Sequence, residues 1–215
     1  MGEINTCDRN CPCSEQIHDC KFIVLTGGPG AGKTALLETL KKQLCMHVAI
    51  LPEAAGIVFG GGFWRLDSGT ARTASQKAIF HVQREMENLV LGENKWAIGL
   101  CDRGTLDGLA YWPGSEGSFF ERFNTTKNKE YEKYTAVIHL RSPNLDHGYN
   151  HQNPLRTESA IEAKIIDDKI HKIWKDHSNY TMVESQSDFI EKIKVAYQKI
   201  SFFVPSCCGG HFNDV

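Results

Sequence analysis

The sequence predicts an α/β fold in which a five-stranded parallel sheet is covered by helices on both faces, giving three layers. The first observation is that short apolar runs rich in β-forming residues alternate five times with segments of helical periodicity. Strands that alternate with crossover helices build a parallel sheet with both faces buried. The second observation is the length of 215 residues with 41% hydrophobic residues, which is enough for one core.

The domain is expected to span residues 21–204, between a cysteine-rich tail over residues 1–20 and a second tail over residues 205–215. Each expected strand is an apolar run that ends at a glycine or a polar residue. The strands are expected at residues 22–26, 47–51, 96–101, 135–140 and 180–184.

The helices are identified by apolar residues at helical spacing. Residues 56–69 mix glycines with aromatic residues and, like residues 142–155, are expected to form a loop. The helices are expected at residues 33–44, 71–94, 105–111, 118–124, 157–177 and 188–203, with Ile79, Met86, Leu89 and Val90 on one stripe and Ile161, Ile165, Ile170 and Trp174 facing inward.

The segment between the first strand and the first helix reads GGPGAGKT over residues 27–34 and fits the phosphate-loop pattern G-x-x-x-x-G-K-[ST]. Glycines let successive backbone N–H groups point at phosphate oxygens, and the helix that follows adds its positive end. The Lys33 ammonium is expected to reach the β- and γ-phosphates, and the Thr34 hydroxyl to bind Mg²⁺. The expected phosphate contacts are Gly28, Pro29, Gly30, Ala31, Gly32, Lys33, Thr34 and Ala35.

Charged residues stand where the strands end, which is where ligands bind in open α/β sheets. Asp102 is expected to serve Mg²⁺ or to accept a proton, or alternatively to cap the next helix, and Glu53 is the second candidate base. One of these two carboxylates would serve the metal and the other the acceptor hydroxyl. Arg103 could clamp a phosphate or pair with a surface acid, and Arg141 and Arg156 bracket a loop that could close over the transferred phosphoryl group.

The acceptor side is less defined by the sequence. Phe63 and Trp64 lie in the glycine-rich loop and could cover a flat or apolar molecule, or form a small cluster of their own. Gln83 could form a hydrogen bond with an acceptor or simply lie on the helix surface. Asp107, in the segment after the third strand, is a further candidate contact.

Five segments resemble a known family: LTGGPGAGKT, LPEAAG, AIFHVQREME, CDRGTLDGLAYW and LRTESAIEAKIIDDKIHKIW. They resemble the small AAA-type ATPase domains related to the NadR ribosylnicotinamide kinase domain, over about residues 21–200. This resemblance implies a P-loop NTPase fold with a bound nucleoside triphosphate.

More distantly, the layout is similar to that of deoxynucleoside and thymidylate kinases. That similarity implies Glu53 as the general base, Gln83 as the reader of a nucleoside base and Asp102 with Arg103 as the acidic–arginine pair after the third strand. It also implies lid arginines, of which Arg156 is the better match and Arg141 the weaker. The chain departs from those kinases at Gly104, where they usually have serine, and at the glycine-rich residues 60–62.

We therefore expect an enzyme that binds ATP and Mg²⁺ and moves the γ-phosphoryl group to the hydroxyl of a small molecule, such as a nucleoside or ribosyl compound. The alternative is a regulatory ATPase or a GTP-binding switch that acts through a partner protein. ATP is preferred because the Asn-Lys pair at residues 128–129 lacks the aspartate of a guanine-reading N-K-x-D and precedes a strand. The acceptor and the oligomeric state are left open.

Other function classes fit poorly. The net charge of −2 does not predict nucleic-acid binding, and no run of about 20 apolar residues predicts a membrane helix, so a cytoplasmic location is expected. A mechanical ATPase of the larger AAA+ kind would carry Asp-Glu after the third strand, where this chain has Asp102-Arg103. The spacing of Cys7, Cys11, Cys13 and Cys20 is not a familiar zinc pattern, and whether they bind a metal is left open.

Overall fold

The sheet has the predicted architecture. A computed structural model of the protein describes residues 18–41, 44, 46–142, 159–184 and 189–205. All pairs of neighbouring strands are parallel, and β1 lies at the centre of the order β2-β3-β1-β4-β5. The strands of this five-stranded sheet are β1 (Lys21–Thr26), β2 (Val48–Leu51), β3 (Ile98–Asp102), β4 (Tyr134–Leu140) and β5 (Tyr180–Val183).

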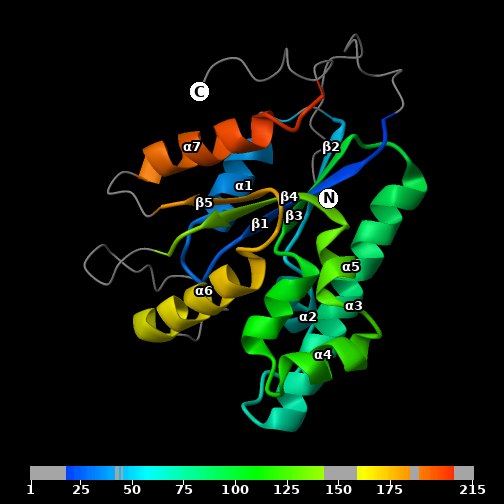
Figure 1. The fold of residues 1–215 in the computed structure, drawn as a ribbon, viewed down its shortest axis with the longest axis vertical. Helices are drawn as coiled ribbons and strands as arrows, with labels where there is room; N and C mark the ends of the chain where they lie inside the picture. Colours follow the sequence, from blue (N-terminus) through cyan, green and yellow to red (C-terminus); the bar gives the residue numbers. More distant parts are fainter. Residues whose placement is uncertain (1–17, 42–43, 45, 143–158, 185–188, 206–215) are drawn as a thin grey trace.

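Helices cover both faces of the sheet, which confirms the three layers (Figure 1). Helices α1 and α7 lie on one face, and α3, α4, α6 and the 3₁₀ helix η1 pack on the other. The helical elements are α1 (Lys33–Lys41), α2 (Ala54–Gly60), α3 (Gly69–Glu93), η1 (Thr105–Tyr111), α4 (Glu116–Phe123), α5 (Lys127–Tyr131), α6 (Ala160–Trp174) and α7 (Phe189–Ser201).

The central strand shows why two cores form. Side chains alternate between the two faces of a strand, and all of those in the middle of β1 are buried. Ile23 and Leu25 pack with α1 and α7, whereas Phe22 and Val24 pack with α3, η1, α4 and α6. Because all the strands are parallel, their carboxyl ends lie at one edge of the sheet, between the two helical layers.

The predicted inward stripe of α3 is partly wrong. Val90 is buried, but Leu89 is 60% exposed. The side that packs on the sheet carries polar residues among apolar ones, because they form hydrogen bonds within the protein. The buried residues of this side include Gln76, Phe80, Gln83, Glu87 and Val90.

The stripe predicted for α6 is wrong in its first half. Ile170 and Trp174 are fully buried as predicted, whereas Ile161 and Ile165 are 63% and 50% exposed. The spacing explains the error, since positions 165 and 170 are five apart in the sequence and a helical face repeats every three or four positions. The buried side of α6 consists instead of Ala163, Asp167, Ile170 and Trp174.

Two short helices were not predicted. Residues 56–69 are only partly a loop, since α2 extends to Gly60 and includes Gly56. Glycine is a poor helix former, at a cost of about 1 kcal/mol relative to alanine, and for this reason the composition did not predict a helix there. Helix α5 was missed as well, although Thr126 caps it through its side chain. The segment predicted at residues 105–111 is helical but adopts 3₁₀ geometry.

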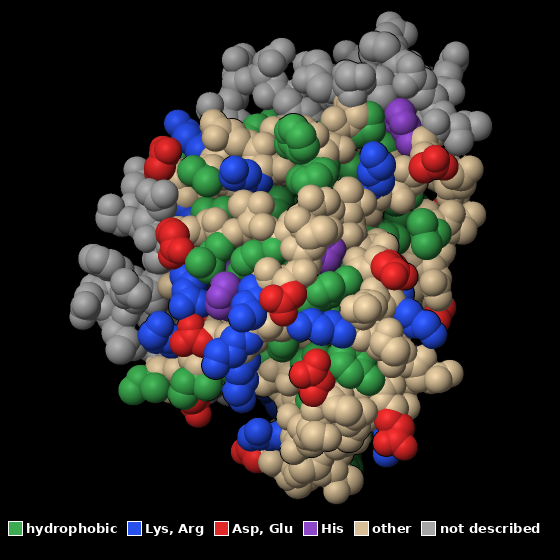
Figure 2. All heavy atoms as spheres, viewed as in Figure 1, with side chains coloured by type: hydrophobic (Ala, Val, Ile, Leu, Met, Phe, Trp, Pro, Cys, Tyr) green, Lys and Arg blue, Asp and Glu red, His purple; other side chains and the backbone are tan. Residues whose placement is uncertain are grey.

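The surface carries charges of both signs. In the face drawn in Figure 2, Lys and Arg side chains gather over α6, with Asp and Glu side chains among them. Among the described residues, no helix combines the length and the apolar character needed to cross a membrane.

Candidate functional site

The glycines of residues 27–34 allow the turn between β1 and α1 to form. Gly27, Gly30 and Gly32 have φ values of 133°, 80° and 94°, a region that side-chain-bearing residues rarely adopt. At Gly27 a Cβ would also lie 2.1 Å from the carbonyl oxygen of Leu140. Any other residue at position 27 would therefore push the loop away from β4.

The loop presents free backbone donors. Within the described part of the chain, no protein group accepts a hydrogen bond from the amides at the end of the loop and the start of α1. Such amides, at the positive end of a helix, form an anion-binding site. Gly28 and Ala31 are exceptions, because the Gly28 N–H donates to Asp167 at 2.7 Å and the Ala31 N–H donates to the Gly28 carbonyl oxygen at 3.3 Å. Among the described residues, the amides whose N–H has no protein acceptor are those of Gly30, Gly32, Lys33, Thr34 and Ala35.

Lys33 lies inside this turn. Its side chain is buried, and Nζ donates to the carbonyl oxygens of Gly27 at 2.9 Å and Gly28 at 3.0 Å. Burial, followed by repulsion from Arg103, lowers the pKa of Lys33 to about 8. The ammonium therefore lies beside the free amides and remains mostly charged at neutral pH.

Arg103 connects the ends of β2, β1 and β3. Its Nε donates to Oε1 of Glu53 at 2.6 Å, and its Nη1 donates to the carbonyl oxygen of Gly27 at 3.1 Å. Burial opposes ionisation of Glu53, but the charges of Arg103 and Lys33 hold its pKa below the usual value. Glu53 is therefore an ionised carboxylate. A ligand can reach it, because 38% of its side chain is exposed.

Asp107 fixes the position of Arg103 through an ion pair. Its Oδ2 accepts from the Thr26 hydroxyl at 2.6 Å and from Arg103 Nη1 at 3.3 Å. Its Oδ1 accepts from the indole N–H of Trp174 at 2.6 Å. Asp107 lines the pocket described below, but both of its oxygens are bound to groups of the protein. The sequence identified Asp107 and Arg103 separately and did not reveal the link to Trp174.

Asp102 differs from Glu53 in its surroundings. It is only 6% exposed, and burial raises its pKa to about 6 although Lys33 counteracts this. Its Oδ1 is buried and has no hydrogen-bond partner among the described residues. The N-cap of η1 is Gly104, so Asp102 does not cap that helix. A buried carboxylate oxygen without a partner is a suitable acceptor for a hydrated cation.

The donor set fits Mg²⁺ on this ground. Mg²⁺ prefers oxygen ligands and commonly keeps several waters while it binds one or two protein groups and substrate phosphates. The exposed Thr34 hydroxyl and the carboxylate of Asp102 line the same pocket and could supply such oxygens.

These residues open into one pocket of about 640 Å³. It extends from the phosphate loop along α2 and α3 and is bordered on the other side by η1 and α6. Lys33, Glu53, Asp102, Arg103 and Gln83 all line it, so the structure brings together residues that the sequence placed on different strands and helices.

Gln83 lies at the α3 wall of the pocket and is 3% exposed, so it is not a surface residue. Its Nε2 donates to Oε1 of Glu87 at 2.9 Å. The same oxygen of Glu87 accepts from the Tyr134 hydroxyl at 2.8 Å. Glu87 was missed by the sequence reasoning, although a charged residue on the buried stripe of a helix is a recognisable signal.

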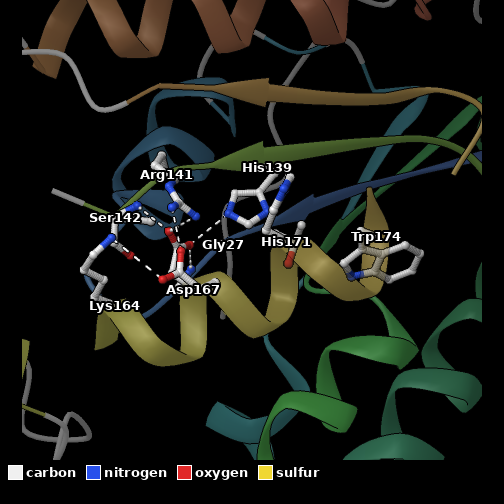
Figure 3. A network of polar contacts seen from close by, with 12 residues as sticks. Gly27, His139, Arg141, Ser142, Lys164, Asp167, His171 and Trp174 are labelled. Atoms are coloured by element: carbon white, nitrogen blue, oxygen red, sulfur yellow. Dashed lines mark hydrogen bonds and ion pairs between the residues drawn. The ribbon is translucent and has the colours of Figure 1, made fainter. Parts of the chain in front are cut away.

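Three other predicted residues do not line the pocket. Phe63 and Trp64 are 40% and 78% exposed and do not line the pocket, whereas their neighbours Arg65 and Leu66 do. Arg141 forms ion pairs with Asp167 at 3.2 Å and Asp168 at 2.6 Å on α6 (Figure 3).

Arg156 lies outside the described residues, as do Cys7, Cys11 and Cys13. Cys20 is a half-buried free thiol, and burial raises its pKa to about 11. Among the described residues, no group of three or more metal-binding side chains comes together.

Three solved structures share the fold with TM-scores just above one half. Deoxyadenosine kinase from M. mycoides with bound dATP is 14% identical, with a TM-score of 0.54 over 84% of this chain and 98% of that chain. Thymidylate kinase from Ehrlichia chaffeensis is 16% identical, with a TM-score of 0.53 over 84% and 96%. Thymidylate kinase from Candida albicans is 12% identical, with a TM-score of 0.54 over 84% and 90%.

These likenesses show that the fold is the P-loop fold of nucleoside and nucleotide kinases. No curated protein matches the sequence. The family model described as AAA domain matches residues 22–192. Because that match spans more than half of the chain and includes the phosphate loop, the protein belongs to the AAA-domain family of P-loop NTPases.

Proposed function

We propose that this protein is a phosphotransferase that uses ATP and Mg²⁺ to phosphorylate a hydroxyl group of a small molecule. The observation that carries the proposal is the single pocket that Glu53 shares with Lys33 and the phosphate loop. A reaction between two bound molecules requires that both sites open into one space that can exclude water. The pocket continues beyond Glu53 along α2 and α3, where the acceptor is proposed to bind.

The different surroundings of the two carboxylates suggest a division of roles. Glu53 is ionised, accessible and oriented by Arg103, which suits a base that accepts the proton of the acceptor hydroxyl. Asp102 is buried with a free oxygen beside Lys33, which suits a residue that holds Mg²⁺ together with Thr34. When bound, Mg²⁺ would neutralise charge on the phosphate oxygens.

Lys33 would move from the carbonyl oxygens of Gly27 and Gly28 to the β- and γ-phosphates. Arg103 would keep Glu53 in position and add positive charge beside the transferred group. Arg156 and Arg141 are proposed to contact the phosphates, which for Arg141 requires that its ion pairs with α6 be exchanged.

The acceptor is proposed to be a nucleoside or ribosyl compound, as the resemblance to nucleoside kinases implies. Gln83 would bind its polar edge, and Phe63 and Trp64 would approach from the rim of the pocket. Asp107 is proposed to contribute by orienting Arg103, since its oxygens are bound to Thr26, Arg103 and Trp174.

The test is a screen of hydroxyl compounds with Mg·ATP and, in parallel, Mg·GTP, read as acceptor-dependent release of the nucleoside diphosphate. For the best acceptor, Glu53→Gln should lower turnover by about 100-fold or more, because glutamine keeps the contact with Arg103 but is not a base. Its affinity for ATP should stay within about threefold of wild type.

The matched control is Glu38→Gln, an exposed glutamate on α1, which should behave like wild type. If no acceptor stimulates turnover and Glu53→Gln hydrolyses ATP as wild type does, the kinase proposal is wrong. Acceptor-independent hydrolysis that a partner protein accelerates would instead favour a regulatory ATPase or GTPase.

A further inference from the structure

Two buried charged residues that do not line the pocket form hydrogen bonds with the phosphate loop. Asp167 of α6 is 1% exposed and accepts a hydrogen bond from the Gly28 N–H at 2.7 Å. Lys192 of α7 is 4% exposed and donates to the carbonyl oxygen of Ala31 at 2.8 Å. We refer to Asp167 and Lys192 together as the loop brace. A charge buried on a helix is expensive unless it is fully paired, so these two residues call for an explanation.

The contact with Asp167 is part of a dense polar cluster (Figure 3). Its Oδ1 also pairs with Nε2 of His139 at 2.8 Å, and its Oδ2 accepts from the Ser142 N–H at 3.2 Å. Although burial opposes ionisation, hydrogen bonds from His139, Gly28 and Ser142 hold the pKa of Asp167 below the usual value. The carboxylate is therefore fixed to the end of β4 and can serve as a rigid anchor.

Glycine at position 28 permits this contact. A Cβ there would lie 2.5 Å from Ser142 Oγ and 2.7 Å from Asp167 Cβ. The backbone of the loop thus lies directly against α6. A charge-assisted hydrogen bond at so close an approach fixes the direction of the Gly28 N–H.

The geometry of the peptide unit passes this constraint to the pocket. In a planar trans peptide, the N–H of one residue and the C=O of the residue before it point in opposite directions. With the Gly28 N–H directed at Asp167, the Gly27 C=O points into the site, where Lys33 and Arg103 donate to it at 2.9 and 3.1 Å.

The same argument applies to Lys192. Because Lys192 holds the Ala31 C=O away from the pocket, the N–H of Gly32 points toward it, and among the described residues no group accepts a hydrogen bond from that N–H. Lys192 also donates to the backbone carbonyl oxygen of Arg141 at 2.5 Å, which fixes its own position at the end of β4.

We propose that Asp167 and Lys192 are positioning residues that orient the peptide units of the phosphate loop before a triphosphate binds. They touch neither nucleotide nor acceptor and act through Gly28 and Ala31. Preorganised donors bind an anion more tightly because the cost of ordering them has already been met in folding. The inference depends on the triphosphate-binding part of the proposed function and not on the acceptor.

The experiment compares two isosteric variants with controls on the same helices. Asp167→Asn removes the charge of the anchor, and Asp168→Asn removes a carboxylate that also pairs with Arg141, at 2.6 Å, without touching the loop. Lys192→Met and Lys194→Met form the second pair, since Lys194 lies two positions further along α7 and is not fully buried.

Binding of inorganic tripolyphosphate and of Mg·ATP is measured by calorimetry. Asp167→Asn and Lys192→Met should each weaken both ligands by about tenfold, the effect of losing one charge-assisted hydrogen bond. Both controls should remain within about twofold of wild type. In amide hydrogen exchange, Gly28 should exchange faster in Asp167→Asn while the core amide of Leu25 stays protected, which a general loss of stability would not produce.

Unchanged tripolyphosphate and ATP affinity in both brace variants would overturn the inference, as would equal losses in the controls. If one variant does not fold, the other decides. A third outcome separates the two proposals. If wild type binds triphosphate and the two variants lose affinity as expected, but no acceptor is phosphorylated, the role of the loop brace is supported and the proposed reaction is contradicted. Wild-type protein that binds neither ligand would overturn both.

Discussion

Arg103 has a strained backbone at the centre of the site. Its φ of 78° lies in the left-handed region, which costs a residue other than glycine on the order of 1 kcal/mol. The conformation directs the guanidinium to Glu53, to the Gly27 carbonyl and to Asp107 at once. Strain of this kind is retained where the surrounding contacts require it, and it marks Arg103 as part of the site.

Replacing Arg103 should change the pH dependence of turnover. Arg103 counteracts burial at Glu53 and at Asp102, so Arg103→Gln should raise the pKa of both carboxyls. The proposed reaction needs both carboxyls in their ionised form, and the acid limb of the pH profile of kcat/KM should therefore move to higher pH. A profile measured between pH 4 and 8 checks this. An acid limb that stays in place in Arg103→Gln would show that neither carboxylate limits the rate.

Glu87 should make the protein less stable as the pH rises. Burial raises its pKa to about 7, although hydrogen bonds from Gln83 and Tyr134 counteract this. The folded state then holds a proton that the unfolded state releases near pH 4.5, so stability is lost between pH 4.5 and 7. Glu87→Gln keeps the shape but removes the titration.

We expect the free energy of unfolding of wild type to fall more than that of Glu87→Gln between pH 4.5 and 7.5, by up to about 3 kcal/mol. Urea titrations of both proteins at the two pH values measure the difference. Parallel pH dependence of the two proteins would contradict the assignment of a buried, protonated Glu87.

At the scale of elements, α6 explains why position 104 differs from the serine usual in deoxynucleoside kinases. A Cβ at Gly104 would lie 2.7 Å from Cζ2 of Trp174 and 3.0 Å from Cγ2 of Val24. Trp174 occupies that space because its indole N–H is bound to Asp107. Gly104 and Trp174 are thus one packing arrangement between β3, η1 and α6.

Gly104→Ser should lower the free energy of unfolding by about 1–3 kcal/mol, because the added atoms overpack the contact. In a Trp174→Phe background, where the larger ring is gone, the same substitution should cost less by about 1 kcal/mol or more. A double-mutant cycle from denaturant titrations measures this coupling. Equal costs in both backgrounds would mean that Trp174 does not exclude the side chain.

The helices show how far the sequence could be interpreted. The positions of α1, α3, α6 and α7 followed from apolar periodicity, but the faces of α3 and α6 were partly misassigned because only apolar residues were counted. On α6 the buried positions 163, 167, 170 and 174 alternate in steps of four and three, and Asp167 is one of them. A charged residue on such a stripe is a signal for a polar network that the sequence alone could have given.

At the scale of the whole molecule, the sequence predicted the sheet, the phosphate loop and the carboxylates at the strand ends, because these depend on local patterns. It could not predict which side of the loop each strand end occupies. The order β2-β3-β1-β4-β5 places Glu53 and Asp102 on one side of β1 and Arg141 on the other. Links such as Asp107 to Trp174 depend on long-range packing, which no local pattern encodes.

The central claim is that the turn between β1 and α1 binds a triphosphate through its free amides and Lys33. Its most direct test is calorimetric titration of Mg·ATP into wild-type protein, Lys33→Ala and, as a control, Lys172→Ala on the exposed side of α6. We predict saturable binding to wild type and to Lys172→Ala, and a loss of affinity of at least about 100-fold in Lys33→Ala. Equal affinity of Lys33→Ala and wild type for Mg·ATP would contradict the account.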